Sequence, residues 1–405
     1  MNGFWSLVGF EYRKILRKKS VVITLLLAII LSLISCWGTL LGNYYIEGKR
    51  FESHYEGMIK DRTYARSLAG RELDAGLILE AAQAYARIPE AVLYQGTEEY
   101  QTSARKYSGI YSISRAIYNT DSRRFNMEDF QVLTKKQAED FYTLRREKQT
   151  LAVEQTQMSD KSKEAVLALD DRVKTPFTFS YTDGYTRFFT LMYSEGLLAA
   201  FVMAICIAPL FSAEYATGAD QLILASKHGK RRLIQAKLLT GFSLAAAITL
   251  TLTALSYFLS MLTFGFDGGN APLQLYYPMS PYPLTMGQTA LLLSICILFA
   301  CLLTAAITML LSAKLKSPFG VIVLISLLLV VPMFIQVSYD PVWLSNLVHL
   351  LPTYMMDFGP VTSPIQYEVL GLVVHPYVVM PLFAAVVSIL LAPLAYLAFK
   401  HHQIV

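Results

Sequence analysis

Charged residues are scarce in this chain, at 16% of its 405 residues, whereas soluble domains usually carry nearer a quarter. The scarcity is uneven, because several long stretches contain almost no charge. Only four cysteines are present, Cys36, Cys206, Cys296 and Cys301, and each lies in one of these apolar stretches. The hydrophilic part of the chain has none, which excludes a disulfide framework there.

Several chemical motifs are also missing. The sequence has no phosphate-binding loop of the form Gly-x-x-x-x-Gly-Lys followed by Ser or Thr, so it lacks that device for binding ATP. The hydrophilic part has no Gly-x-Ser-x-Gly elbow, no His/Cys cluster and no convincing carboxylate pair. We therefore expect a non-enzyme without catalytic or metal-binding residues and without a cofactor of its own. Any work driven by ATP and Mg²⁺ would need a second polypeptide.

Apolar residues make up 54% of the sequence and gather in six stretches that can each cross a bilayer. Crossing the hydrocarbon layer takes roughly 20 apolar residues in a helix. The stretches are Val21–Leu41, Phe188–Phe211, Leu238–Phe264, Thr285–Ala313, Phe319–Val337 and Tyr377–Phe399. Backbone groups in a bilayer need internal partners, and no alternating strands of about ten residues appear, so helices are expected. The sequence predicts an all-α polytopic membrane protein with six transmembrane helices.

The positive charges predict how the chain is oriented. Outside residues 42–187, every Lys and Arg falls on one side of the six-helix topology, while the loops Gly265–Leu284 and Ser338–Pro376 on the other side have none. The positive-inside rule then places both termini in the cytoplasm and the domain 42–187 outside the cell, in a multi-pass protein of the cell membrane. This domain holds 22 basic and 22 acidic residues, so the net charge of +5 arises on the cytoplasmic face. It suits contact with membrane lipids and gives no indication of nucleic-acid binding.

The N-terminal part of the chain allows more than one interpretation. Residues 1–20 have the spacing of a cytoplasmic amphipathic helix, which either lies at the membrane interface and moves with the transport machinery or is a basic flank that sets topology. The run Leu33–Cys36 resembles a bacterial lipoprotein cleavage site. The apolar stretch continues to Leu41, however, which favours a transmembrane helix over residues 21–41 and against lipidation of Cys36.

The domain 42–187 is expected to be mainly helical. Leu73, Leu77 and Ala81 recur at helical spacing, and Thr134 with Gln137 predicts a capping box. Only Phe177–Tyr181 shows the alternation of a strand.

Glu195 is the one ionisable residue placed well inside an expected span. It is a possible in-membrane polar site, because such residues often mark ion paths. Two other interpretations remain: the side chain faces a cavity or partner helix, or the second span begins later than Phe188.

The segment 212–237 between the second and third stretches has a pattern of capping, apolar and glycine residues that an ordinary basic loop does not require. Ser212 can cap a short helix, with Glu214 in its first turn. Leu222 and Ile223 offer an apolar face, and Gly229 ends the helix ahead of a basic turn. Such a rigid projection can fit a groove on a cytosolic partner.

This segment resembles the coupling-helix region of ABC-2 type transporter permeases. The resemblance rests on Phe-Ser-x-Glu-Tyr-x-x-Gly from Phe211, and on Leu-Ile-Leu-x-Ser-x-x-Gly-x-Arg from Leu222. His228-Gly229 departs from the family, where proline is common. One span, a large external domain and five more spans also match the family's layout. The resemblance implies that the loop 212–237 couples to a separate ATP-binding subunit, in two copies, and that a second permease chain, identical or homologous, completes the transporter. The residues that it places in the coupling segment are Glu214, Tyr215, Gly218 and Arg231.

The expected function is therefore that of a permease subunit in an ATP-driven exporter of an amphipathic substrate, such as a lipid-like molecule, a drug or an antimicrobial peptide. Two alternatives remain. One is a mechanotransmission-type ABC permease, which has four spans. The other is a membrane sensor or immunity protein whose extracellular domain captures a ligand.

Overall fold

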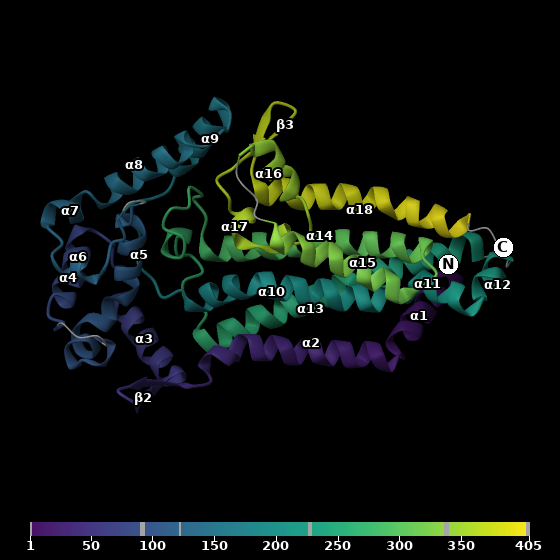
Figure 1. Ribbon diagram of the computed structural model, residues 1–405, viewed down its shortest axis with the longest axis horizontal. Helices are drawn as coiled ribbons and strands as arrows, with labels where there is room; N and C mark the ends of the chain where they lie inside the picture. Colours follow the sequence, from purple (N-terminus) through teal and green to yellow (C-terminus); the bar gives the residue numbers. More distant parts are fainter. Residues whose placement is uncertain (1, 90–93, 121–122, 226–228, 336–339, 402–405) are drawn as a thin grey trace.

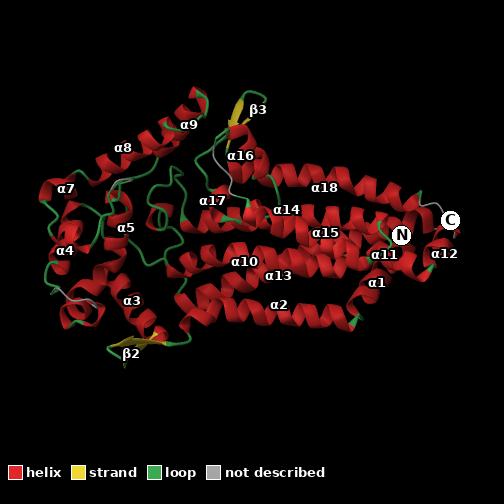
Figure 2. Cartoon of the chain, viewed as in Figure 1, coloured by secondary structure: helices red, strands yellow, loops and turns green. Residues whose placement is uncertain are grey.

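The computed structural model describes residues 2–89, 94–120, 123–225, 229–335 and 340–401, and these residues are mostly helical (Figure 2). Figure 1 shows an elongated molecule in which a bundle of long helices carries an inserted domain, residues 42–182, at one end. The N- and C-terminal parts of the chain lie at the other end. We call these two ends the domain end and the terminal end.

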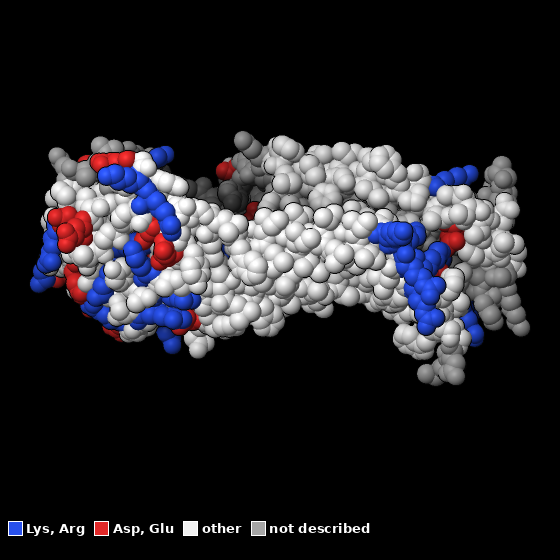
Figure 3. Space-filling view, turned by 90° about the horizontal axis from the view of Figure 1, so that it is seen from below, with Lys and Arg blue, Asp and Glu red and all other residues white. Residues whose placement is uncertain are grey.

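Five helical segments among the described residues are long and apolar enough to cross a membrane. They are α2 (Lys19–Trp37), α10 (Asp183–Ile207) with its continuation α11 (Pro209–Thr217), α13 (Ile234–Phe264), α14 (Met286–Lys314) and α18 (Pro376–Lys400). On the face seen in Figure 3, charged side chains gather over the inserted domain and near the terminal end, and a broad band between them is almost free of charge. The helical, membrane-embedded character expected from the sequence is thus confirmed.

The described part of the fifth expected stretch, Phe319–Val337, forms a shorter helix, and its last two residues lie outside the described residues. It consists of α15 (Pro318–Val330) and a 3₁₀ turn, η7 (Val331–Phe334). At their usual rises these 17 residues extend roughly 28 Å, just below the ~30 Å of a hydrocarbon layer. Pro332 lies inside the turn, where it has no backbone donor to continue the helix. The described residues therefore contain five long helices and one shorter apolar helix.

The end of α15 is closed by side chains from the returning chain. Thr353 Oγ1 donates to the carbonyl of Leu329 at 2.9 Å, and the Tyr354 hydroxyl donates to the carbonyl of Pro332 at 2.7 Å. Met356 packs against Gly196 in the middle of α10, so this return segment enters the bundle. Backbone carbonyls at a helix end within an apolar layer need such partners.

The remaining elements are short. The first helix, α1 (Asn2–Leu16), precedes α2 at the terminal end, and η1 (Gly38–Leu40) follows α2. The inserted domain contains β1 (Asn43–Ile46), β2 (Lys49–Ser53), α3 (His54–Leu68), α4 (Ala75–Tyr85), η2 (Tyr94–Gly96), η3 (Tyr100–Ala104), η4 (Arg105–Tyr107), α5 (Ser108–Tyr118), α6 (Met127–Gln131), α7 (Lys135–Glu139), α8 (Phe141–Glu154) and α9 (Asp160–Asp170). The connections within the bundle contain α12 (Ala219–Ala225), η5 (Gly229–Leu233), η6 (Leu273–Leu275), α16 (Val342–Val348), η8 (Tyr354–Met356), α17 (Phe358–Val361), β3 (Tyr367–Val369) and β4 (Leu372–Val374).

Local signals in the inserted domain are only partly confirmed. The capping box is present: Gln137 N donates to Thr134 Oγ1 at 3.3 Å, and Thr134 N donates to Gln137 Oε1 at 2.9 Å. The alternating run Phe177–Tyr181 forms no strand and makes one isolated bridge. Two antiparallel hairpins, β1–β2 and β3–β4, were not expected. Each turns on a residue pair with positive φ ending in glycine, Glu47-Gly48 and Leu370-Gly371, as tight hairpins require.

The inserted domain is fastened to the loops at the domain end of the bundle. The Arg145 guanidinium donates to the carbonyls of Pro278 (2.8 Å) and Ser280 (2.9 Å). It also pairs with Asp170 at 2.7 Å, and both side chains are almost fully buried. Glu368 on β3 accepts a 2.7 Å hydrogen bond from Ser162 on α9. The domain is thus joined to both the α13–α14 and the α15–α18 connections.

A close crossing of α10 and α13 at the domain end requires glycine. A Cβ at Gly184 would lie 2.1 Å from the carbonyl oxygen of Gly265, a backbone atom that cannot rotate away. We expect Gly184→Ala to destabilise the protein by about 1–3 kcal/mol, because the two helix ends would have to separate. A Cβ at Gly9 on α1 would have no neighbouring atom within 4 Å, so Gly9→Ala is the control. Thermal unfolding of the purified variants in detergent measures the difference, and equal midpoints would contradict the close crossing.

Candidate functional site

A buried group of charges joins three helices at the terminal end of the bundle. Lys237, near the start of α13, has 0% of its surface exposed. Its Nζ donates to Glu11 on α1 at 3.0 Å, to Glu214 on α11 at 2.7 Å and to the carbonyl of Leu210 at 3.0 Å. A buried ammonium needs such partners, because losing its hydration shell is costly. Lys237 is therefore fully satisfied by groups from α1 and α11.

Lys14 completes the group, which we call the ion cluster: Glu11, Lys14, Glu214 and Lys237. The Lys14 ammonium pairs with Glu214 and lies 3.8 Å from Glu11 Oε2. Burial works against its charge, but the two carboxylates outweigh that effect and raise the pKa of Lys14 above its usual value. Two cations thus face two anions, and the cluster is neutral as a whole.

The ion cluster explains how the N-terminal helix is held. Glu11 and Lys14 are three apart on α1 and so share one face of that helix. Val8 and Ile15 are buried, and the Tyr12 hydroxyl donates to Ser243 Oγ on α13 at 2.6 Å. Helix α1 therefore packs on α13, which a simple basic flank would not need to do.

Helix α11 continues α10 after Ala208 and carries Glu214 to the cluster. Pro209 begins α11 and cannot donate a backbone hydrogen bond. Ser312 on α14 compensates, since its hydroxyl donates to the carbonyl of Ala208 at 2.6 Å and accepts from the amides of Phe211 (3.0 Å) and Ser212 (3.1 Å). The junction of α10 and α11 is thus held by a neighbouring long helix.

Gly218 ends α11 and turns the chain toward the surface. Its φ of +69° lies in the left-handed region that favours glycine, and α12 begins at the next residue. The short helix expected from Ser212 therefore begins at Ala219 instead. Ser212 lies inside α11, where its hydroxyl donates to the carbonyl of Ala208 at 2.7 Å. The expected cap at Ser212 was wrong because α11 continues the long helix α10 past Ala208.

The structure separates the four residues expected in the coupling segment. Glu214 is buried in the ion cluster. Tyr215 also turns inward: its hydroxyl donates to the carbonyl of Ala313 at 2.7 Å, and its ring lies 5.4 Å from that of Phe399. Gly218 forms the turn, and Arg231 in η5 is exposed.

We call the described residues 219–225 and 229–232 of this region the terminal segment. Leu222 on α12 is 77% exposed, and Arg231 and Arg232 are exposed on η5. α12 projects at the far terminal end of the molecule (Figure 1). The distinctive residue His228 falls outside the described residues.

Sequence reasoning did not identify Glu11, Lys14 and Lys237 as parts of one site. The three were indistinguishable from residues of a basic membrane flank. One signal was available: Glu11 is the only acidic residue within a strongly basic N-terminal helix, and an isolated opposite charge there suggests a specific partner.

Glu195 lies in the middle of α10 and faces α2. Its Oε2 accepts a hydrogen bond from Ser32 at 2.7 Å, and both side chains are buried. Helix α10 begins at Asp183, ahead of Phe188, and the point along it at which the membrane span begins stays a prediction. Of the expectations, contact with a partner helix is the one that the structure bears out.

No protein-family model, curated protein or solved structure matches this chain.

Proposed function

We propose that this chain is the membrane-spanning permease subunit of an ATP-driven exporter of the ABC-2 type, which works with a separate ATP-binding chain. The observation that carries the proposal is the ion cluster. It joins α11 and α13, the helices on either side of the terminal segment, to each other and to α1 through buried contacts of Lys237 with Glu11 and Glu214. A partner that pulls on this segment would therefore move two long helices together rather than deform a loose loop.

In this mechanism ATP and Mg²⁺ bind to two partner subunits, and their closure draws the terminal segments of two permease chains together. Helices α1, α11 and α13 then move as one unit, because the ion cluster joins them. The partner shifts the permease only if its contacts differ between the two states. The terminal segment offers a partner two kinds of contact: the apolar side chain of Leu222, and the cations Arg231 and Arg232.

The proposal includes an orientation. Both termini and the terminal segment face the cytoplasm, and the inserted domain is extracellular. In support, exposed Arg13, Arg17 and Lys19 gather near the terminal end, while the connections 265–284 and 338–376 at the domain end contain no Lys or Arg. The cargo would be amphipathic, because the lining of the bundle is largely apolar. The sixth span would be formed by α15 and η7.

The sharpest test changes the exposed apolar contact. Leu222→Asp is expected to reduce recovery of the ATP-binding chain with the tagged permease by at least roughly tenfold, as loss of one central apolar contact does. Val132→Asp is the matched control, since Val132 is 74% exposed on the inserted domain at the opposite end. Arg231→Ala should act in the same direction.

The measurement is quantitative co-purification from membranes that contain both chains, followed by the ATP hydrolysis rate of the complex. Equal recovery of the partner with Leu222→Asp, Arg231→Ala and Val132→Asp would overturn the assignment. Glu214→Ala is a poor test of docking, because Glu214 is buried and offers no contact to a partner. The substitution would also leave Lys237 with one carboxylate fewer.

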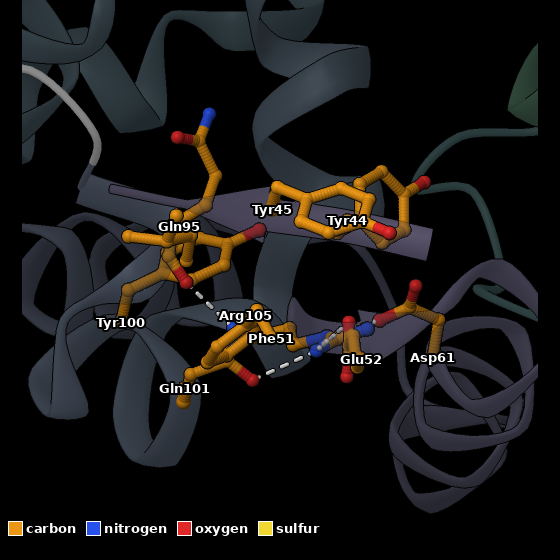
Figure 4. A pocket seen from close by; sticks show the side chains of 10 residues that line it. Tyr44, Tyr45, Phe51, Glu52, Asp61, Gln95, Tyr100, Gln101 and Arg105 are labelled. Carbon is orange, nitrogen blue, oxygen red and sulfur yellow. Dashed lines mark hydrogen bonds and ion pairs between the residues drawn. The ribbon is translucent and has the colours of Figure 1, made fainter. Parts of the chain in front are cut away.

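A second candidate, the membrane sensor, has one observation in its favour. The inserted domain has a cavity of about 360 Å³ whose walls include Tyr44, Tyr45, Phe51 and Tyr100 (Figure 4). Aromatic walls suit an apolar or aromatic ligand group. Ligand binding by a chain that recovers no ATP-binding partner would favour the sensor. A mechanotransmission permease fits less well, because five helices exceed its four spans.

A further inference from the structure

A seam of polar groups lies between α2, α10 and α13 near the domain end, within the membrane-spanning part of the bundle. Trp37 Nε1 on α2 donates to Thr263 Oγ1 on α13 at 2.9 Å, which fixes the register of these two helices. Just below that level, Arg187 Nη2 on α10 donates to the carbonyls of Ser35 and Cys36 (3.2 Å to Cys36). Ser260 on α13 lies next to the Cys36 thiol.

The seam continues one helical turn deeper. Ser32 is four residues before Cys36 on α2, and Ser256 is four residues before Ser260 on α13. Residues four apart share a helix face, so Ser32 and Ser256 occupy the next level of the same interface. Ser32 donates to Glu195 there. Glu195 leans toward the domain end, because helical side chains point toward the N-terminus of their helix.

Three buried polar atoms along this seam have no hydrogen-bond partner among the described residues: Arg187 Nε, Ser256 Oγ and Ser260 Oγ. Ser256 is 1% exposed and Ser260 is 0% exposed. The Cys36 thiol beside Ser260 is only a weak partner for a hydroxyl. Buried polar groups in proteins are normally satisfied, and ordered water satisfies them where protein atoms do not. Water between the three helices would satisfy these three polar groups.

We propose that this seam is a hydrated pocket opening toward the domain end, and that Glu195 is a proton-binding site at its inner end. A proton moves from hydronium in the water of the pocket to an oxygen of Glu195, leaving water behind, and it departs by the same route. In the protonated state the carboxyl group is neutral, which suits a site in the apolar layer. The inference does not depend on an ATP-binding partner.

The groups that face Glu195 from each neighbouring helix support a proton rather than a metal ion. From α2, Ser32 donates to Glu195 and the Cys36 thiol lies close to its carboxylate, while Ser260 on α13 lies beside that thiol. From α14 the Cys301 thiol reaches the carbonyl of Gly196 at 3.9 Å. The cation Arg187 lies about two turns away on the same helix. The described residues hold no cluster of three metal-binding side chains.

Infrared difference spectroscopy tests the proposal on the purified full chain in lipid nanodiscs. Spectra recorded at about pH 4 and about pH 9 should contain the carbonyl-stretch band of a carboxylic acid in an apolar site. That band should vanish in Glu195→Gln, whose amide oxygen can still accept from Ser32, and move in Glu195→Asp. It should persist in Glu368→Gln, a hairpin carboxylate outside the bundle. An unchanged spectrum in Glu195→Gln would overturn the proposal.

Cysteine reactivity tests the water separately. Ser256→Cys should react with a small charged thiol reagent added to the nanodiscs at least tenfold faster than Ala245→Cys, as mass spectrometry of the labelled peptides would show. Ala245 is the control because it is 0% exposed in the dry apolar core of the same helix. Equal rates at the two positions would show that the seam is dry and would overturn the hydrated pocket.

Discussion

Lys237→Met is expected to lower the free energy of unfolding by about 3–5 kcal/mol, the usual cost of removing one partner from a buried ion pair. The substitution leaves Glu11 and Glu214 buried with only Lys14 to neutralise them. Methionine fills most of the volume of the lysine side chain, so the loss reflects charge more than packing. Reversible unfolding in mixed detergent micelles provides the measurement.

Two controls separate the ion cluster from a general effect of losing a basic residue. Arg232→Met, at an exposed position five residues earlier, should change stability by less than about 1 kcal/mol. The double variant Lys237→Met with Glu214→Gln removes one charge of each sign and leaves Glu11 facing Lys14. It should recover much of the lost stability, because the groups are coupled. If the single variant were no less stable than Arg232→Met, the cluster would not hold α1, α11 and α13 together.

Arg145→Met is expected to release the inserted domain from the bundle at a cost of about 3–5 kcal/mol. It removes the ion pair to buried Asp170 and leaves the carbonyl of Pro278 without its donor, while the carbonyl of Ser280 keeps only Gln274 Nε2 as a donor. We expect faster hydrogen–deuterium exchange in the connection 265–285, together with a lower unfolding temperature.

The adjacent residue provides the matched control. Arg146 pairs with Asp171, but both side chains are about half exposed. An exposed pair contributes little, so Arg146→Met should cost about 1 kcal/mol or less and leave exchange in the connection unchanged. Equal effects of the two substitutions would show that the domain is held by other contacts.

Local properties of the sequence were sufficient to predict the long helices and several of their ends. Five of the six expected stretches are long apolar helices, because a membrane helix satisfies its own backbone and needs only about 20 apolar residues in a row. The capping box at Thr134 and Gln137 is equally local. The hairpin turn at Glu47-Gly48 could have been found from its glycine, but the short strands beside it gave a weak pattern.

Tertiary packing alone decided the site. Glu11 and Lys237 are 226 residues apart in the sequence, and only the packing of α1 on α13 brings their charges to 3.0 Å. The same holds for the Arg145 contacts with the α13–α14 connection, and for the end of α15, which depends on Thr353 and Tyr354 from the returning chain. Composition and hydropathy determine which segments can enter a membrane, since that depends on each segment by itself. Which charges become buried partners depends on how the helices face one another, and hydropathy carries no information about that.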